Sequence, residues 1–593
     1  MQGARRVMMV LIGCSLGLTA MAGKKNVVTT NSEIAGTGNL SKIHREELVA
    51  KIGKIKEFLQ QSPDTNAVQL LSFAADLEKE VRNKKFGLVF EEHKERVDVE
   101  LEENLPVLTE NKSRLIDNGG EVNFLIEGDN LAALKLLEKT HRGKIDLIYI
   151  DPPYNTGSKD FVYNDRIVDI TDLFRHSKWL SFMRKRLDLA KHIMSDKGVI
   201  FISIDDNEQA ELKVLCDDIF GHNNFITCFP WQSRQSLQND TDMSINHEYI
   251  ICYAKNRRQT ERRLKAKNAK IWRDLPGFVF QPMSVDRSKY SNPDDDPRGP
   301  WKADPFDAPN VRENLSYAIV NPNTGEEFYP PNGRHWRMMR EKYEEALLDN
   351  RIIFGKSGKS KPQLKVFFNE QEAYGSVPNS WFSADTYGTA TEGTKELQSI
   401  LGKGMFDTVK PTRLIEGLIT LASNGDITVL DFFAGSGTTG HAVMKLNAED
   451  GGKRKFILVT NNENEICEKV TYERLKRVIE KENYAAKLKY YKIDYVPIKE
   501  QMYYEYADDL LAHIRELVEL ENGVDFTHDS EIAIVLTDDE IEKLSKNASK
   551  IKKIKTLYRG HNVMMSKTIE EKLKGLNIEI KVIPQYYYPE LEG

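Results

Sequence analysis

Two stretches of the chain, 121–255 and 411–495, alternate short apolar runs with helical repeats. Residues 198–204 are almost entirely apolar, which is typical of a parallel strand that is covered on both faces. Strands that alternate with helices favour a parallel sheet. We therefore predict an α/β fold with one doubly wound, mostly parallel, Rossmann-like sheet that an insertion divides. Residues 224–231 and 247–254 predict an antiparallel hairpin at its edge.

The rest of the chain has other patterns. Residues 41–95 show the three- and four-residue spacing of helices, and residues 256–400 are rich in Pro, Asn, Asp, Gly and Trp. Strands are expected near 531–537 and 578–583. The predicted parts are a leader (1–22), a helical N-terminal region (41–120), a first half-sheet (121–255), an inserted domain (256–400), a second half-sheet (401–498) and a small C-terminal α/β domain (499–593).

The first 22 residues have the elements of a secretory signal: Arg5 and Arg6, an apolar run over 7–22, and an Ala-Met-Ala ending. The alternative is that they precede the true start, with Met21 as the initiator. Five cysteines without a CxxC pair argue against a zinc ribbon or a disulfide framework and favour a reducing compartment. The net charge of −6 excludes a chain that is basic throughout.

The first motif whose residues could take part in a reaction is Asp151-Pro152-Pro153-Tyr154, directly after the strand predicted over 144–150. Open α/β sheets bind ligands at the carboxyl ends of their strands. A carboxylate and a rigid prolyl carbonyl are both acceptors, so together they could hold the two hydrogens of an exocyclic amine. The tyrosine ring could stack on the base that bears it. The alternative is a turn in which the acid caps the next helix.

A glycine-rich turn between an apolar strand and a helix is the second motif. Its residues of interest are Asp431, Phe433, Gly435, Gly437 and Thr438. Glycines here permit a tight turn and a close approach of the backbone to a ligand at the helix N-terminus. No Gly-Lys-Ser/Thr follows, so the turn is not a phosphate-binding P-loop. The alternative is a turn without a ligand.

An acid after the next strand, 455–460, would help to bind a ribose. Glu463 and Glu465 are both available there, and the sequence does not choose between them. Either one could instead be a solvated loop residue.

The combination resembles S-adenosylmethionine-dependent amino-methyltransferases that act on DNA. Asp151–Tyr154 looks like the catalytic motif and residues 433–437 like the cofactor loop, in the beta-class order of N6-adenine methyltransferases. The resemblance implies that Lys410 and Pro411 close the methionine side of the cofactor pocket. It also assigns Asp129 and Asn130, in the similar stretch 125–134, to the cofactor site.

Further stretches, among them 176–187, 198–208, 296–301 and 460–475, are similar to the modification subunit of type III restriction–modification systems. This resemblance covers about residues 40–593. It implies S-adenosylmethionine as cofactor, no metal, duplex DNA as substrate, a homodimer, and a restriction subunit with helicase and nuclease activity as partner. A signal peptide does not suit such an enzyme, so we expect a cytoplasmic protein without a membrane segment.

DNA recognition is expected in the insertion. Residues 255–290 carry 11 Lys or Arg against 3 Asp or Glu, with aromatic residues among them. Basic charge supplies affinity for phosphate, whereas contacts to base edges supply specificity. The candidates are Arg262, Arg263, Lys265, Arg298 and Trp301. A solvated basic helix is the alternative.

The expected reaction is methyl transfer to N6 of an adenine that is flipped out of duplex DNA. Cytosine N4 is an alternative target, although that subfamily more often has Ser at the place of Asp151. An orphan methyltransferase without a nuclease partner and an inactive DNA-binding specificity subunit are further alternatives. A nicotinamide dehydrogenase fits poorly, because the acidic motif precedes the glycine turn.

Overall fold

The computed structural model describes residues 40–61, 66–82, 90–157, 162–163, 166–167, 169, 171–238, 241–258, 277–373, 375–423, 425–498, 503–526 and 531–588. The chain divides into two compact units, Met1–Val89 and Phe90–Gly593. Among the described residues, no helix is long and apolar enough to cross a membrane.

The first unit contains two paired helices, α2 (Leu40–Gln60) and α3 (Ala67–Arg82). Ala67 and Ala74 of α3 are buried, and Lys56 Nζ of α2 lies 2.7 Å from Glu78 Oε2 of α3. The leader, 1–22, lies outside the described residues.

The second unit is organised around one large sheet in the order β1-β19-β3-β18-β17-β4-β7-β9-β8. Its central strands from β19 to β7 run parallel, and β9 is antiparallel to both of its neighbours. The bounds are β1 (Asn104–Glu110), β19 (Ala486–Pro497), β3 (Glu121–Glu127), β18 (Lys455–Thr460), β17 (Thr428–Asp431), β4 (Ile145–Ile150), β7 (Met194–Ile204), β9 (Glu248–Ala254) and β8 (Phe225–Trp231). The predicted fold class and the edge hairpin are confirmed.

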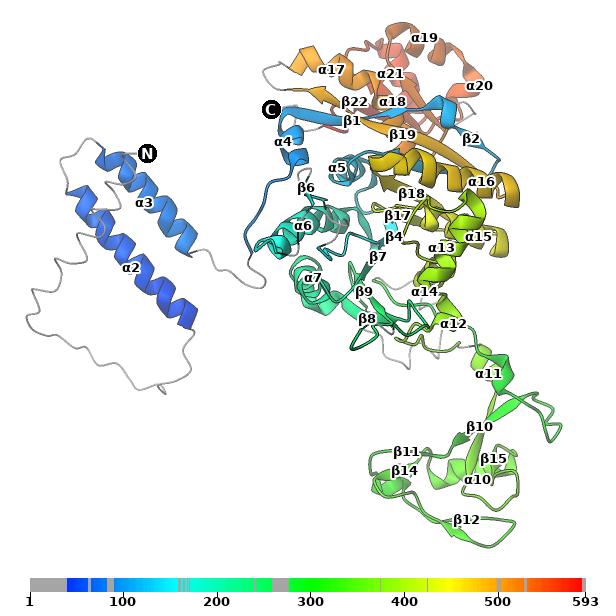
Figure 1. Cartoon of the computed structure of the whole chain (residues 1–593). Coiled ribbons are helices and arrows are strands. Elements are labelled where there is room, and N and C mark those ends of the chain that lie inside the picture. Colours follow the sequence, from blue (N-terminus) through cyan, green and yellow to red (C-terminus); the bar gives the residue numbers. More distant parts are fainter. Residues whose placement is uncertain are drawn as a thin grey trace, which may run out of the picture. The chain divides into compact units, whose positions relative to one another are not determined.

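Helices cover both faces of this sheet (Figure 1). One face carries α5 (Asn130–His141), α6 (Arg175–Ile193) and α7 (Gln209–Cys216), and the other carries α14 (Thr412–Ala422), α15 (Thr438–Asp450) and α16 (Glu473–Glu482). Leu125, Leu147, Phe201 and Leu458 are fully or almost fully buried between these layers, which explains the continuous apolar runs.

The region 41–120 is not helical throughout. After α4 (Arg96–Glu103), the chain forms β1 and the short β2 (Ile116–Asp117), and both pair with β19. Their partner lies nearly four hundred residues further along the chain, so no local repeat reveals the pairing.

The insertion has a small core of its own, in which Phe306, Trp336 and Tyr343 are buried together. It contains a three-stranded sheet of β10 (Trp301–Pro305), β16 (Gln363–Phe367) and β15 (Ile352–Ile353), two further strand pairs, and helix α10 (Arg340–Leu348). Both ends of the insertion nevertheless pack into the core of the main sheet, through Phe278 on one side and Phe382 and Tyr387 on the other.

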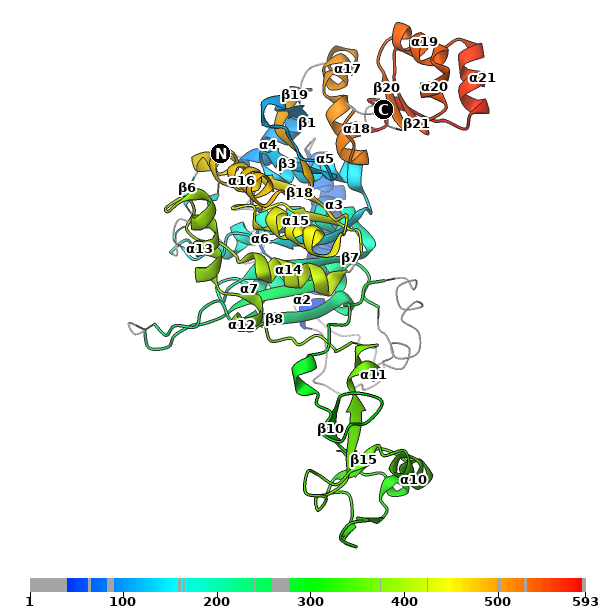
Figure 2. The same cartoon turned by 90° about the vertical axis from the view of Figure 1, so that its right-hand side faces the viewer.

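The C-terminal region has two parts. Helices α17 (Tyr503–Ala512) and α18 (Ile514–Asn522) join the main sheet, where Glu519 Oε2 lies 2.6 Å from Lys489 Nζ of β19. A parallel sheet of β20 (Ile532–Val535), β21 (Thr556–Gly560) and β22 (Glu579–Ile583) follows, with α19 (Asp538–Lys546), α20 (Ala548–Ile551) and α21 (Lys567–Gly575) (Figure 2). The two strands expected here are confirmed, and β21 was missed.

Candidate functional site

The acidic motif and the glycine turn meet at the carboxyl edge of the sheet. Strand β4 leads into Asp151, and the neighbouring parallel strand β17 ends at Asp431. The antiparallel strand β9 starts at this same edge with Glu248. The topology thus brings together carboxylates that are far apart in the sequence.

The Asp151 carboxylate is bound by a buried ammonium group. Lys410 Nζ lies 2.9 Å from Oδ1 and 2.8 Å from Oδ2 of Asp151, and it also donates to the Tyr154 hydroxyl at 2.9 Å. The Tyr154 hydroxyl is 2.9 Å from Asp151 Oδ1 and 3.0 Å from Glu248 Oε2. These four side chains form a compact polar cluster in which Asp151 accepts an N–H donor on both oxygens.

Burial and charge act in opposite directions on this cluster. Burial disfavours the charge on Lys410, but Asp151 and Glu248 outweigh it and raise the pKa of the ammonium above its usual range. Burial, with the same two carboxylates, raises the pKa of Tyr154 well above normal. Lys410 is therefore charged and Tyr154 neutral at physiological pH.

The two prolyl carbonyls of the motif differ. Trp179 Nε1 of α6 donates to the Pro153 carbonyl at 2.7 Å and anchors the loop. Among the described residues, none donates to the Pro152 carbonyl. Of the two prolyl carbonyls that could accept from an amine, that of Pro152 is the one to which no described residue donates.

The glycine turn has the backbone conformation that its residues predict. Gly435 and Gly437 have φ values of 47° and 74°, in the left-handed region that favours glycine. The Gly435 carbonyl accepts from Thr471 Oγ1 at 2.6 Å, and Gly437 N–H donates to the Ala434 carbonyl at 2.8 Å. The turn is thereby fixed where α15 begins.

The predicted Lys410-Pro411 segment lies against this turn. Thr438 Oγ1 donates to the Lys410 carbonyl at 3.2 Å, and Pro411 is buried before α14. The Lys410 side chain, however, points to Asp151. The backbone of this segment thus lies beside the predicted cofactor loop, while its ammonium belongs to the acidic cluster.

Asp431 is buried beneath the turn. Its carboxylate accepts from Thr439 Oγ1 at 2.6 Å and from Phe433 N–H at 3.0 Å. Burial raises its pKa to about 7, and the hydrogen bonds only partly offset this. In this structure the side chain therefore stabilises the turn from below.

Asp129 and Asn130 lie at the carboxyl end of β3. Asp129 caps α5 by accepting from Leu131 N–H at 2.7 Å, and Asn130 donates to the Phe432 carbonyl at 3.0 Å. Buried Arg186 donates to Asn130 Oδ1 at 2.5 Å. These residues connect the end of β3 to the glycine turn.

The structure also distinguishes the two loop acids after β18. Glu465 Oε2 lies 2.5 Å from Lys469 Nζ, whereas Glu463 is exposed and no described residue pairs with it. Of the two acids, Glu463 is thus the one whose carboxylate has no partner among the described residues.

A family model described as DNA methylase matches residues 145–473, which is more than half of the chain. The chain belongs to the DNA methylase family. The match spans the acidic motif, the insertion and the glycine turn.

Individual relatives are similar over a shorter part. The type III restriction-modification enzyme StyLTI Mod subunit of Salmonella typhimurium is 37% identical over 398 residues, which cover 61% of this chain and 57% of that protein. The EcoPI Mod subunit of Escherichia phage P1 is 33% identical, covering 61% of each. The chain thus spans less than two thirds of the length of these two Mod subunits. Among solved structures, the PvuII DNA methyltransferase (cytosine-N4-specific) is 11% identical with a TM-score of 0.31, covering 69% of this chain and 96% of that one.

The residues expected to contact DNA fall into two groups. Arg262, Arg263 and Lys265 of this DNA methylase lie outside the described residues. Arg298 is engaged inside the insertion, where it pairs with Asp296 at 2.8 Å and with Asp349 at 2.8 Å.

Trp301 is also an internal residue. It is buried, and its indole N–H donates to Asp294 Oδ1 at 2.8 Å. The polar groups of Arg298 and Trp301 are thus paired within the insertion, and their contact with DNA stays a prediction.

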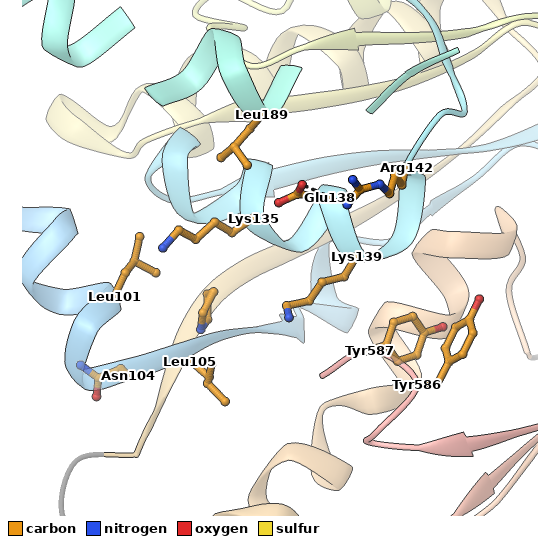
Figure 3. A pocket seen from close by; sticks show the side chains of 11 residues that line it. Leu101, Asn104, Leu105, Lys135, Glu138, Lys139, Arg142, Leu189, Tyr586 and Tyr587 are labelled. Atoms are coloured by element: carbon orange, nitrogen blue, oxygen red, sulfur yellow. Dashed lines mark hydrogen bonds and ion pairs between the residues drawn. The ribbon is translucent and has the colours of Figure 1, made fainter. Parts of the chain in front are cut away.

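A recess of about 490 Å³ lies away from this edge, beside the C-terminal half of α5 (Figure 3). Lys135, Lys139, Arg142, Leu101, Tyr586 and Tyr587 contribute to its lining. It contains none of the residues predicted for chemistry, so the recess is separate from the candidate active site of this DNA methylase. Among the described residues, no cluster of His, Cys, Asp and Glu is arranged to hold a metal.

Glu248 is the site residue that the sequence reasoning missed. It begins β9, whose antiparallel direction places its first residue at the carboxyl edge of the parallel strands. The predicted edge hairpin could have indicated this position. A strand that runs antiparallel to the others places its first residue, and not its last, at the carboxyl edge of the sheet.

Proposed function

We propose that this DNA methylase transfers a methyl group from S-adenosylmethionine to N6 of adenine in duplex DNA. The observation that carries the proposal is the Asp151 carboxylate, which already holds an N–H donor on both oxygens at the carboxyl edge of the sheet. An exocyclic amine presents the same kind of donor. Asp at this position favours adenine over cytosine, as expected from the resemblance.

The chain's own groups suit the chemistry of an amine nucleophile. Asp151 and the Pro152 carbonyl would accept the two amino hydrogens and draw the nitrogen toward tetrahedral geometry, which frees its lone pair for the new N–C bond. As the methyl group leaves the sulfur, the nitrogen would release one proton to Asp151 and from there to solvent. Lys410 now fills the donor position on Asp151, so its ammonium has to release at least one oxygen when a base enters. Placed acceptors and orientation are the main contributions to the rate.

The residues beside the glycine turn suit the cofactor that the family implies. The left-handed turn brings backbone close to a ligand, Glu463 is an available acceptor for ribose hydroxyls, and Asp129 and Asn130 adjoin the turn. When bound, S-adenosylmethionine supplies an electrophilic methyl group on a sulfonium. We propose Phe433, Gly435, Gly437, Thr438 and the Lys410–Pro411 backbone as its contacts, with Asp431 supporting the turn from below.

We further propose that the chain is the modification subunit of a type III restriction–modification system. The support is its similarity to the Mod subunits of Salmonella typhimurium and phage P1. Duplex DNA, a second copy of the chain and a restriction subunit with helicase and nuclease activity would then be its partners, in the cytoplasm. Co-purification and sedimentation of the native complex test these assignments.

The proposed reaction is tested by sequencing methylated bases in host DNA with and without the gene. N6-methyladenine at one recurrent motif, lost on deletion, is the expected result. N4-methylcytosine at that motif would show that the target is cytosine and not adenine. Unchanged methylation after deletion of the gene would contradict the proposed reaction altogether.

Tyr154 is expected to act through its ring. Stacking on a flipped base contributes roughly 1–3 kcal/mol, so Tyr154→Ala should lower methyl transfer about ten- to hundredfold. Tyr154→Phe keeps the ring and should retain most activity, although it loses the hydroxyl contacts to Asp151 and Glu248. Initial rates of both variants measure this, and equal losses would assign the role to the hydroxyl.

The basic stretch 255–290 is expected to follow the phosphate backbone. Replacing Arg262, Arg263 and Lys265 with Ala should weaken binding to specific and non-specific DNA alike. It should also reduce the magnitude of the slope of log affinity against log salt concentration by up to about three, roughly one for each phosphate contact that is lost. Fluorescence anisotropy over a salt series is the measurement. A loss confined to one DNA sequence would instead indicate base readout.

A further inference from the structure

The catalytic loop continues into a buried asparagine with an unusual backbone. Asn155 is fully buried and has a φ of 57°, in the left-handed region that Asn tolerates better than most residues. Its Nδ2 donates to Glu208 Oε1 at 2.5 Å and to the Arg175 carbonyl at 3.3 Å. The side chain thus connects the end of the loop to α6 and to the residue before α7.

Glu208 is itself fully buried and receives a second donor. His176 Nδ1 lies 2.7 Å from Glu208 Oε1. Arg175 Nε donates to His176 Nε2 at 3.1 Å, so the hydrogen of the neutral ring is on Nδ1 and points to Glu208. Both donors therefore converge on one carboxyl oxygen.

Within the described part of the chain, the other oxygens of this pair lack a hydrogen donor. Glu208 Oε2 and Asn155 Oδ1 are buried, and no described residue forms a hydrogen bond with either of them. Both are acceptors when Glu208 is ionised. A proton on Oε2 would make it a donor, and a carboxylic acid and an amide can then join through two parallel hydrogen bonds. One proton would satisfy both oxygens.

The surroundings favour that proton. Burial raises the pKa of Glu208 to about 8, and Asp205 and Glu211 add to this, while Asn155 and Arg175 oppose it. Burial lowers the pKa of His176, so the ring is neutral above pH 7. The charged and titratable groups that face Glu208 are Arg175 and His176 of α6, Asp205 after β7, and Glu211 of α7.

We propose that Glu208 is a positioning residue which, as a neutral acid, fixes the catalytic loop through a two-point pair with Asn155. Trp179, which binds the Pro153 carbonyl, anchors the same loop from α6. Together, the Asn155–Glu208 pair and the Trp179 hydrogen bond fix the positions of the Asp151 carboxylate and the Tyr154 ring. The inference rests on the proposed methyl transfer, since Glu208 acts through the residues of that reaction.

The test compares four variants of the full chain. Glu208→Gln is a neutral mimic of the protonated acid and can form both hydrogen bonds, so it should keep at least half of the wild-type kcat. Glu208→Ala should lower kcat ten- to hundredfold with an unchanged Kd for S-adenosylmethionine. Asn155→Gly keeps the left-handed backbone but removes the amide, and should have the same effect. Glu211→Gln, one turn away, is the control for loss of a nearby charge.

The activity should also depend on pH in a defined direction. The wild-type kcat should fall as the pH rises through about 8, because ionised Glu208 loses the donor on Oε2. Glu208→Gln should lack this fall. Incorporation of labelled methyl groups into unmethylated genomic DNA measures both profiles. The Glu211→Gln profile should keep the fall but at a lower pH, because Glu211 helps to raise the pKa of Glu208.

Hydrogen exchange of residues 151–157 gives a readout that does not depend on methylation. Exchange should become faster in Glu208→Ala and Asn155→Gly, but not in Glu208→Gln. If wild type methylates no DNA while exchange follows this pattern, the proposed function fails and the positioning role stands. If wild type methylates and Glu208→Ala matches its kcat, or folded Glu208→Gln is as impaired as Glu208→Ala, the inference is wrong.

Discussion

Asp151→Ala is expected to lower methyl transfer by about 10²–10³-fold, because the target amine loses its main acceptor. Binding of S-adenosylmethionine and DNA should stay near normal. With 2-aminopurine at the target position, fluorescence should remain bright, since flipping does not need the carboxylate. Single-turnover methylation, isothermal titration and fluorescence separate the three steps.

Two comparisons make this result specific. Asp151→Ala also removes a partner of the buried Lys410 ammonium, so thermal unfolding must show that the fold survives. Asp196→Ala removes an exposed carboxylate near the start of β7, at the opposite edge of the sheet, and should leave the rate unchanged. A normal rate in folded Asp151→Ala would exclude this carboxylate from the chemistry.

Gly435→Val is expected to weaken binding of S-adenosylmethionine by at least tenfold. Gly435 has a φ of 47°, where a β-branched residue is strained, and an added Cβ would lie 3.4 Å from the Phe406 ring. The turn would have to change shape beside the proposed cofactor contacts. Isothermal titration measures the affinity, and circular dichroism checks the fold.

Gly425→Val is the matched control for this experiment. Gly425 precedes β17 at the other end of the strand, and its added Cβ would meet only Ser423 at 3.8 Å. It should bind the cofactor as wild type does. Equal affinity of the Gly435 and Gly425 variants would remove the glycine turn from the proposed site.

The sequence predicts where the strands of the site end, but not which distant side chains contact the residues at those ends. The apolar run before Asp151 and the glycines after β17 are local signals, so the fold class and both loops could be predicted. The contact between Lys410 and Asp151 joins positions 259 residues apart, and no periodicity encodes it. The motif predicts where the backbone of Lys410 and Pro411 lies. It does not predict that the Lys410 side chain contacts Asp151, because that contact depends on how α14 packs against the sheet.

Charge and aromatic character proved ambiguous for similar reasons. Arg298 and Trp301 have the composition of DNA contacts, yet the structure uses both inside the insertion. A sequence shows that a guanidinium is present but not whether an acid such as Asp349 will fold back to meet it. Glu208 and Asn155 were overlooked because their burial arises only when α6 and α7 enclose the loop.

The order of strands in the main sheet has a consequence for synthesis on the ribosome. Strand β3 forms early in the chain, but both of its sheet neighbours, β18 and β19, come after residue 454. At ordinary translation rates, that delay is on the order of tens of seconds. Throughout it, both edges of β3 and one edge of β4 lack their native partners. The nascent chain therefore has to keep these apolar strands from pairing with other chains until β17, β18 and β19 have been made.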